Sequence, residues 1–169
     1  MQGQVEQPPP AVQLSQKPGK DPIRIVLDSR LRIPLEARLL HLDSPAPTWV
    51  AATAAAPGEK IKAVQRLGHE VLVLPEEDGR VALKPLLELL GRRRVQSLLV
   101  EGGAAVLGSF FDQRLVNRFF FFFAPKILGG RDAYPAIAGL GVDRLAEAHI
   151  AANLTIRRLG PDVLISGDL

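Results

Sequence analysis

The stretch SLLVEGGAAVLGSFFD, residues 97–112, changes its hydrophobic period at a glutamate followed by two glycines. The apolar run SLLV has the length of a buried strand, whereas AAVLGSFFD places Ala104, Leu107 and Phe111 on one helical face. The stretch therefore predicts a strand, a Gly-Gly turn and a helix, with Glu101 at the carboxyl end of the strand. Units of this kind are typical of α/β proteins.

The rest of the chain supports that class, because strand-like and helix-like segments alternate along it. Strands are predicted over residues 23–28, 48–53, 70–75, 97–100 and 117–125, and helices over residues 57–68, 83–94 and 104–112. Gly68 and Gly91 are expected to end the first two helices. The five consecutive phenylalanines at 119–123 show no alternation, so both faces of their strand are predicted to be buried. Residues 148–168 predict two or three closing antiparallel strands, which gives an α/β fold with a mixed sheet.

Composition limits the function classes. The chain has 169 residues, enough for one domain, and its net charge of +3 is too balanced to indicate nucleic-acid binding. It contains no cysteine, and its three histidines are far apart, so no metal site is expected. No apolar stretch has the length of a membrane span and no signal peptide is recognised, so a cytoplasmic protein is expected.

The first twenty residues differ from the rest in composition. Residues 1–20 are rich in glutamine and proline and show no periodicity, which predicts a disordered or loosely held leader. A proline-rich ligand for another protein is the alternative interpretation of this segment. The ordered domain is expected to cover residues 21–169.

The Gly-Gly junction has two interpretations. A helix that begins after glycines offers unpaired N–H groups and partial positive charge, which suits the phosphates of a nucleotide. Alternatively, the junction is a tight turn in which Glu101 complements the helix dipole. If phosphates bind there, Glu101 should face a second, polar ligand, because a carboxylate repels phosphate.

A second candidate anion site follows the first predicted strand in VLDSRLR, residues 26–32. The Ser29 hydroxyl and the Arg30 and Arg32 guanidiniums suit a phosphate such as the 2′-phosphate of NADP. Taken by themselves, these residues favour the alternative, a polar turn with solvated arginines. Weaker candidates are Lys126 with Gly129 and Gly130, the basic run Arg92 to Arg94, and His69, for all of which a structural role is favoured.

Four stretches in order carry a resemblance to a known family: IRIVLDSRLRIP, LLVEGGAAVLGSFFD, LVNRFFFFFAPKILGG and RLGPDVLISGDL. Together they resemble the reductase domain of the bifunctional riboflavin-biosynthesis deaminase/reductases over roughly residues 21–169. The resemblance implies a dihydrofolate-reductase-like three-layer fold with a mixed, mostly parallel central sheet and antiparallel C-terminal strands. It also implies an oxidoreductase, typically a homodimer, that uses NADPH to reduce the ribosyl group of 5-amino-6-(5-phosphoribosylamino)uracil.

The resemblance also assigns residues. It implies that Ser29 contacts NADP, that Glu101 contacts the substrate, and that the segment wrapping the cofactor comprises Gly103, Ala104, Ala105, Val106, Leu107, Gly108 and Ser109. No proton donor is identified among the matching residues, and no metal, nucleic acid or membrane is implied as a partner.

The chain departs from the family at its N-terminal end. The family's domain has an additional first strand and helix, with further ligand contacts, ahead of the residues that match IRIVLDS. The alternative to an active reductase is therefore an inactive reductase-like domain that serves as a dimerisation or partner-binding module.

Overall fold

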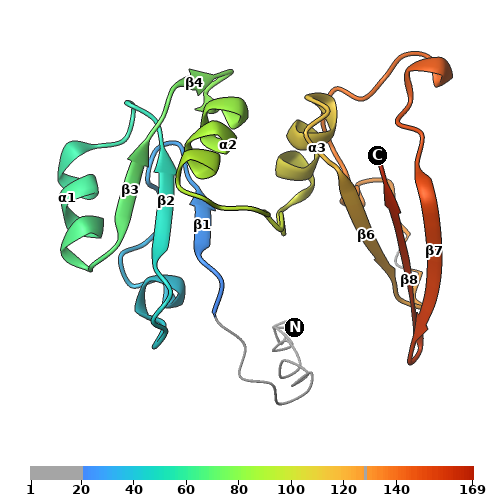
Figure 1. The fold of residues 1–169 in the computed structure, drawn as a ribbon, viewed down its shortest axis with the longest axis horizontal. Coiled ribbons are helices and arrows are strands. Elements are labelled where there is room, and N and C mark those ends of the chain that lie inside the picture. Colours follow the sequence, from blue (N-terminus) through green and yellow to red (C-terminus); the bar gives the residue numbers. More distant parts are fainter. Residues whose placement is uncertain (1–20, 128) are drawn as a thin grey trace. The chain divides into compact units, whose positions relative to one another are not determined.

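The computed structural model describes residues 21–127 and 129–169 and divides into two compact units, Met1–Arg93 and Arg94–Leu169. The predicted leader, residues 1–20, lies outside the described part (Figure 1). Within the described residues, no helix has the length and apolarity needed to cross a membrane.

The first unit is built on a parallel sheet of three strands in the order β1-β2-β3. These strands are β1 (Arg24–Leu27), β2 (Thr48–Ala52) and β3 (Glu70–Val73), and the register pairs Val26 with Val50 and Val50 with Val71. The helix α1 (Gly58–Arg66) connects β2 to β3, and the short 3-10 helix η1 (Arg38–His41) lies between β1 and β2. All three predicted strands and the predicted helix are confirmed.

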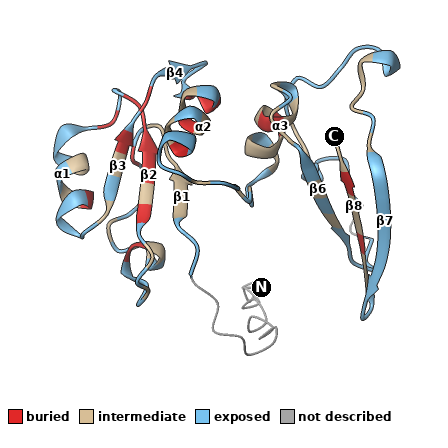
Figure 2. Ribbon diagram, in the orientation of Figure 1, coloured by how far each residue is buried: buried red, intermediate tan, exposed pale blue. Residues whose placement is uncertain are grey.

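The core of the first unit gathers around β2, the central strand. Val50, Ala51 and Ala52 are fully buried, and Val64 of α1 is buried against the same cluster. The helix α2 (Leu83–Arg92) buries Leu83, Leu86 and Leu90, which recur at helical spacing (Figure 2). The spacing of apolar residues therefore correctly predicted both α1 and α2.

The glycine at residue 91 was expected to end α2, and this was wrong. Gly91 lies inside the helix, which continues to Arg92 and is capped by Arg93. Arg94, with φ 62°, takes the left-handed conformation beyond the cap. The expectation for Gly68 is confirmed, because it follows the end of α1 with φ 86°.

A small hairpin between β3 and α2 was not predicted. Its strands are β4 (Glu76–Glu77) and β5 (Arg80–Val81), which pair antiparallel. The two turn residues, Asp78 and Gly79, both have positive φ, 49° and 74°. Asp-Gly is the preferred sequence for a two-residue hairpin turn, so the signal was present in the sequence.

The second unit contains the stretch on which the fold prediction depended. The helix α3 (Ala104–Asp112) has the predicted bounds. Residues 97–100 form no strand, which contradicts the prediction, and the Leu99 side chain is 70% exposed. The reason is that a strand needs a hydrogen-bonded neighbour, and no described strand pairs with this segment. Glu101 therefore does not stand at the end of a strand.

The remaining strands form an antiparallel sheet in the order β6-β8-β7. They are β6 (Arg118–Phe123), β7 (Ala152–Leu159) and β8 (Asp162–Asp168), and a 3-10 helix, η2 (Leu145–Glu147), precedes β7. The burial predicted for both faces of the phenylalanine strand was wrong: Phe120, Phe122 and Phe123 are exposed. The physical reason is that β6 pairs only with β8 among the described residues, which makes it an edge strand.

The α/β class is confirmed, with parallel strands first and antiparallel strands last. In the part of the chain that the structure describes, the two kinds of strand belong to separate sheets rather than to one mixed sheet.

Candidate functional site

The turn that follows β1 is held by hydrogen bonds to Asp28 and by the burial of Leu31, and this leaves its arginines on the outer side. Asp28 accepts a hydrogen bond from the Leu31 amide on its carbonyl, 3.0 Å, and one from the Ile33 amide on Oδ2, 2.7 Å. Leu31, with φ 51°, is only 2% exposed and belongs to the core cluster. Because Leu31 is directed into the core, its neighbours Arg30 and Arg32 are left exposed on the outer side of the turn.

A pocket of about 220 Å³ opens beside this turn. It is lined by Ser29, Arg30, Arg32, Gly79 and Arg80. The turn after β1 supplies the first three residues, and the β4–β5 hairpin supplies the other two. Three of the five lining residues are arginines, which would suit an anion with several oxygens, such as a phosphate.

Ser29 connects the two sides of the pocket. Its Oγ accepts a hydrogen bond from the Val81 amide, 3.0 Å, which ties the turn to the hairpin. Its carbonyl accepts bonds from the amide and the hydroxyl of Thr53, both 3.0 Å, at the carboxyl end of β2. A hydroxyl can accept one hydrogen bond and donate another. While Ser29 Oγ accepts from the hairpin, its O–H donates to no described residue and can donate to a ligand.

The second predicted element of the site is the start of α3. Gly103 is the N-cap, and no side chain among the described residues caps the helix. The first bonds of the helix run from the Val106 and Leu107 amides to the Gly103 carbonyl, 3.0 and 3.2 Å. The amides of Ala104 and Ala105 come before them and are the donors that a helix start offers to an anion. A Cβ on Gly103 would meet nothing within 4 Å, so the approach is open.

The glycine at residue 108 has a different environment. A Cβ placed there would lie 1.6 Å from the Ala138 carbonyl oxygen, so the backbone of Ala138 occupies the space that a side chain would need. The structure places a loop of the same chain there.

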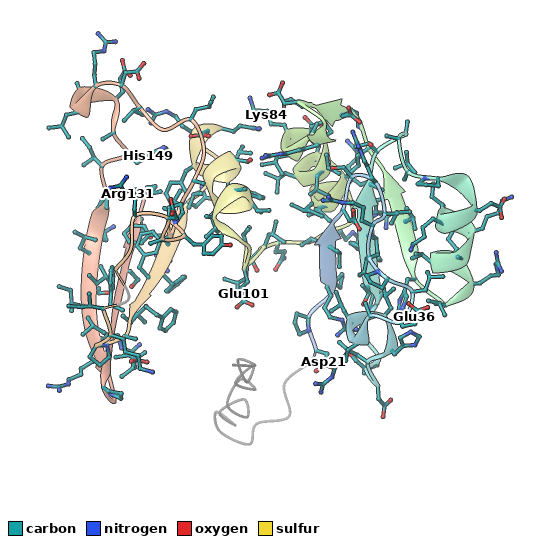
Figure 3. The ribbon with its side chains drawn as sticks, turned by 180° about the vertical axis from the view of Figure 1, so that it is seen from behind. Asp21, Glu36, Lys84, Glu101, Arg131 and His149 are labelled. Carbon is teal, nitrogen blue, oxygen red and sulfur yellow. The ribbon has the colours of Figure 1, made fainter. Side chains whose placement is uncertain are left out.

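Glu101 lies on the segment ahead of α3 and is exposed. Figure 3 shows its carboxylate directed away from that helix.

The structure therefore joins the predicted residues into two groups. Ser29, Arg30 and Arg32 share the arginine-lined pocket, and Glu101 is continuous with the segment Gly103 to Ser109. Gly79 and Arg80 were missed by the sequence prediction. The Asp78-Gly79 turn is the signal that could have placed them next to the strand ends.

Two of the weaker candidates make contacts within the first unit. The His69 ring Nε2 lies 2.8 Å from the Leu40 carbonyl oxygen, and the Arg93 guanidinium binds Glu70. Gly129 and Gly130 have positive φ, which is typical of a turn. Among the described residues, no three potential metal ligands come together.

Comparison with known proteins identifies the family. The model of the RibD C-terminal domain matches residues 3–165. The riboflavin biosynthesis protein RibD of Actinobacillus pleuropneumoniae is 36% identical over 147 residues, which is 87% of this chain and 39% of that protein. A 2,5-diamino-6-ribosylamino-4(3H)-pyrimidinone 5′-phosphate reductase of Archaeoglobus fulgidus is 44% identical over 120 residues, 70% of this chain and 52% of that protein. The chain thus spans between about two fifths and one half of these relatives' length.

Solved structures agree on the fold. Acinetobacter baumannii RibD matches 86% of this chain and 36% of that chain with a TM-score of 0.70 at 24% identity. The yeast riboflavin biosynthesis reductase Rib7 matches 87% of this chain and 68% of that chain with a TM-score of 0.61 at 19% identity. The dihydrofolate-reductase-like fold implied by the sequence is the fold of these reductase domains. The matched family model covers nearly all of the chain, and the chain therefore belongs to the RibD C-terminal domain family.

Proposed function

We propose that this chain is an NADPH-dependent reductase of riboflavin biosynthesis. Its reaction reduces the ribosyl group of 5-amino-6-(5-phosphoribosylamino)uracil to a ribityl chain. The observation that carries the proposal is the family match over residues 3–165, together with relatives that are named as reductases of a ribosylamino-pyrimidinone phosphate.

The arginine-lined pocket supports the choice of NADPH as the cofactor. NADPH differs from NADH by a 2′-phosphate, and a dianionic phosphate suits a pocket that Arg30, Arg32 and Arg80 line. The Ser29 hydroxyl adds a neutral donor at the same place. The donor set therefore fits a phosphate monoester better than it fits a ribose hydroxyl.

In the proposed mechanism, the protein mainly binds and orients the cofactor and the substrate. NADPH supplies a hydride when bound, and hydride transfer depends on alignment and on exclusion of water. The family resemblance assigns cofactor contacts to Ser29 and, separately, to the segment Gly103 to Ser109, whose Ala104 and Ala105 amides would donate to a phosphate. Glu101 accepts hydrogen bonds from N–H or O–H groups of the substrate and thereby orients it. No described residue is assigned as the proton donor.

A test of the cofactor site compares NADPH and NADH binding to Arg30→Ala and Arg32→Ala variants. Each removes a guanidinium from the pocket, so the Kd for NADPH is expected to rise about 10-fold, equivalent to about 1.4 kcal/mol, while the Kd for NADH is unchanged. Arg66→Ala, on the exposed side of α1, is the matched control and should leave both values unchanged. Equal loss of both cofactors would show that the pocket does not recognise the 2′-phosphate.

The names of several relatives favour a second substrate. The Archaeoglobus fulgidus reductase is named for 2,5-diamino-6-ribosylamino-4(3H)-pyrimidinone 5′-phosphate, which carries an amino group in place of a pyrimidine oxygen. Turnover of NADPH, followed by its absorbance, should be measured with both compounds. Turnover of neither would favour the alternative, an inactive reductase-like module for dimerisation or partner binding. A homodimer and a cytoplasmic location remain parts of the proposal.

A further inference from the structure

Two residues of α3 are unfavourable for a helix when the helix is considered alone. Gly108 lies in its interior, where glycine is less favourable than alanine. Asp112 is its last residue, where the helix dipole disfavours a carboxylate. The two are four residues apart and so lie on one face of the helix.

A single segment of the chain accounts for both. Residues 138–141, which we call the strap, cross this face of α3. The backbone of Ala138 fills the space above Gly108, where a Cβ would lie 1.6 Å from the Ala138 oxygen. The carboxylate of Asp112 accepts bonds from the Leu140 amide on Oδ2, 2.8 Å, and from the Gly141 amide on Oδ1, 3.0 Å. Both local penalties are thus offset by the strap.

The strap also reaches the first turn of α3. The Ala138 amide donates to the Ala104 carbonyl, 3.0 Å, so the strap is attached at residues 104, 108 and 112 of the helix. Beyond the strap, the Arg114 guanidinium donates to the Glu147 carbonyl, 3.0 Å, and the Phe111 and His149 rings pack in a T-shaped arrangement with their centroids 5.5 Å apart. The chain from the strap to β7 is therefore tied along the length of the helix.

We propose that Asp112 and Gly108 are positioning residues for the cofactor. They hold the strap, and the strap fixes the first turn of α3, whose amides bind the cofactor phosphates. In this arrangement Gly108 contacts the strap rather than the cofactor, and the cofactor contacts are confined to the start of the segment Gly103 to Ser109. The inference rests on the proposed NADPH binding.

The test uses the full chain with Gly108→Ala, Asp112→Asn and the double variant. Gly91→Ala is the control for the first, because Gly91 is also inside a helix but a Cβ there meets nothing within 4 Å. Asp132→Asn, an exposed carboxylate on the same connection as the strap, is the control for the second in NADPH binding and in cleavage after Arg144, since it adjoins the Arg131 site. Two quantities are measured: the rate of tryptic cleavage after Arg131 and Arg144, which flank the strap, and the Kd of NADPH from its fluorescence, well below the Tm of each variant.

Both single variants should cleave faster and bind NADPH about 10-fold more weakly, with both controls unchanged. The double variant should bind no more weakly than the worse single variant, because both substitutions break the same attachment. Faster cleavage with an unchanged Kd, or additive effects on Kd, would overturn the positioning role. If Gly108→Ala does not fold, Asp112→Asn decides alone. A wild-type chain that binds no NADPH would instead overturn the proposed function, and the inference with it.

Discussion

At the scale of single residues, one partly exposed ion pair stabilises the first unit through a two-point contact between its side chains. Arg93, the cap of α2, donates to both carboxylate oxygens of Glu70 in β3, at 2.7 and 2.6 Å. Its guanidinium also lies 4.8 Å from the centroid of the Trp49 ring, and Trp49 is the β2 neighbour of Glu70. One side chain thereby connects a helix end to two strands.

The pair makes stability dependent on pH. The hydrogen bonds from Arg93 lower the pKa of the Glu70 carboxyl from its ordinary value. A carboxyl whose pKa is lower in the folded state contributes stability above its unfolded pKa, about 4.3, and that contribution is lost as the pH falls through the folded value. The Arg93 side chain is 31% exposed and that of Glu70 is 45% exposed, so solvent screening limits the stabilisation that the pair contributes.

We therefore expect Glu70→Gln to lower the free energy of unfolding by about 0.5–1 kcal/mol near neutral pH. The difference from the wild type should shrink steadily as the pH is lowered below about 4. Urea unfolding across this pH range measures both. Glu59→Gln removes the more exposed pair with Lys62 and should change stability less. A difference that stays constant with pH would show that the ion pair is not its source.

At the scale of elements, two glycines near helix ends predict opposite effects of alanine. Gly91 lies inside α2 with open space around it, so Gly91→Ala should raise the free energy of unfolding by about 0.5–1 kcal/mol. Gly68 has φ 86° beyond the end of α1, so Gly68→Ala should lower it by about 1 kcal/mol. Thermal unfolding of the two variants beside the wild type measures the difference. Effects of the same sign would contradict the assigned end of α2.

The elements also show why prediction succeeded in some places. Helices carry their signal in their own residues, so apolar spacing located α3 with its observed bounds. A strand depends on neighbours that its own residues do not reveal. This is why the prediction failed for residues 97–100, which pair with no described strand, and for the burial of Phe122, which lies in an edge strand.

The candidate site also has one part that local sequence predicts and one part that depends on long-range contacts. Ser29, Arg30 and Arg32 are adjacent in sequence, so a strand followed by a polar turn was enough to group them. Arg80 joins them through a hydrogen bond between residues 29 and 81, a long-range contact that no local pattern encodes. The contacts between the strap and α3 are likewise long-range, so the sequence did not predict them.

At the scale of the whole molecule, the exposed phenylalanines of β6 bear on the proposed homodimer. Phe120 and Phe122 share one face of the strand and are exposed, as is Phe123 on the other face. Exposed aromatic side chains on an edge strand are usually covered by a partner, because they otherwise favour indiscriminate pairing. A second copy of this chain is the partner that the family resemblance implies.

We expect the chain to sediment as a dimer at micromolar concentration and Phe122→Asp to raise the dimer dissociation constant at least about 10-fold, equivalent to about 1.4 kcal/mol. A charge placed in an apolar interface must lose its hydration without a partner, which is the physical reason for the loss. Val73→Asp is the matched control, since Val73 of β3 is 54% exposed and Phe122 is 66% exposed. Sedimentation equilibrium of the three proteins measures the dissociation constants. A wild-type chain that remains monomeric at all concentrations would contradict the dimer, and equal weakening by both substitutions would show that β6 is not the specific interface.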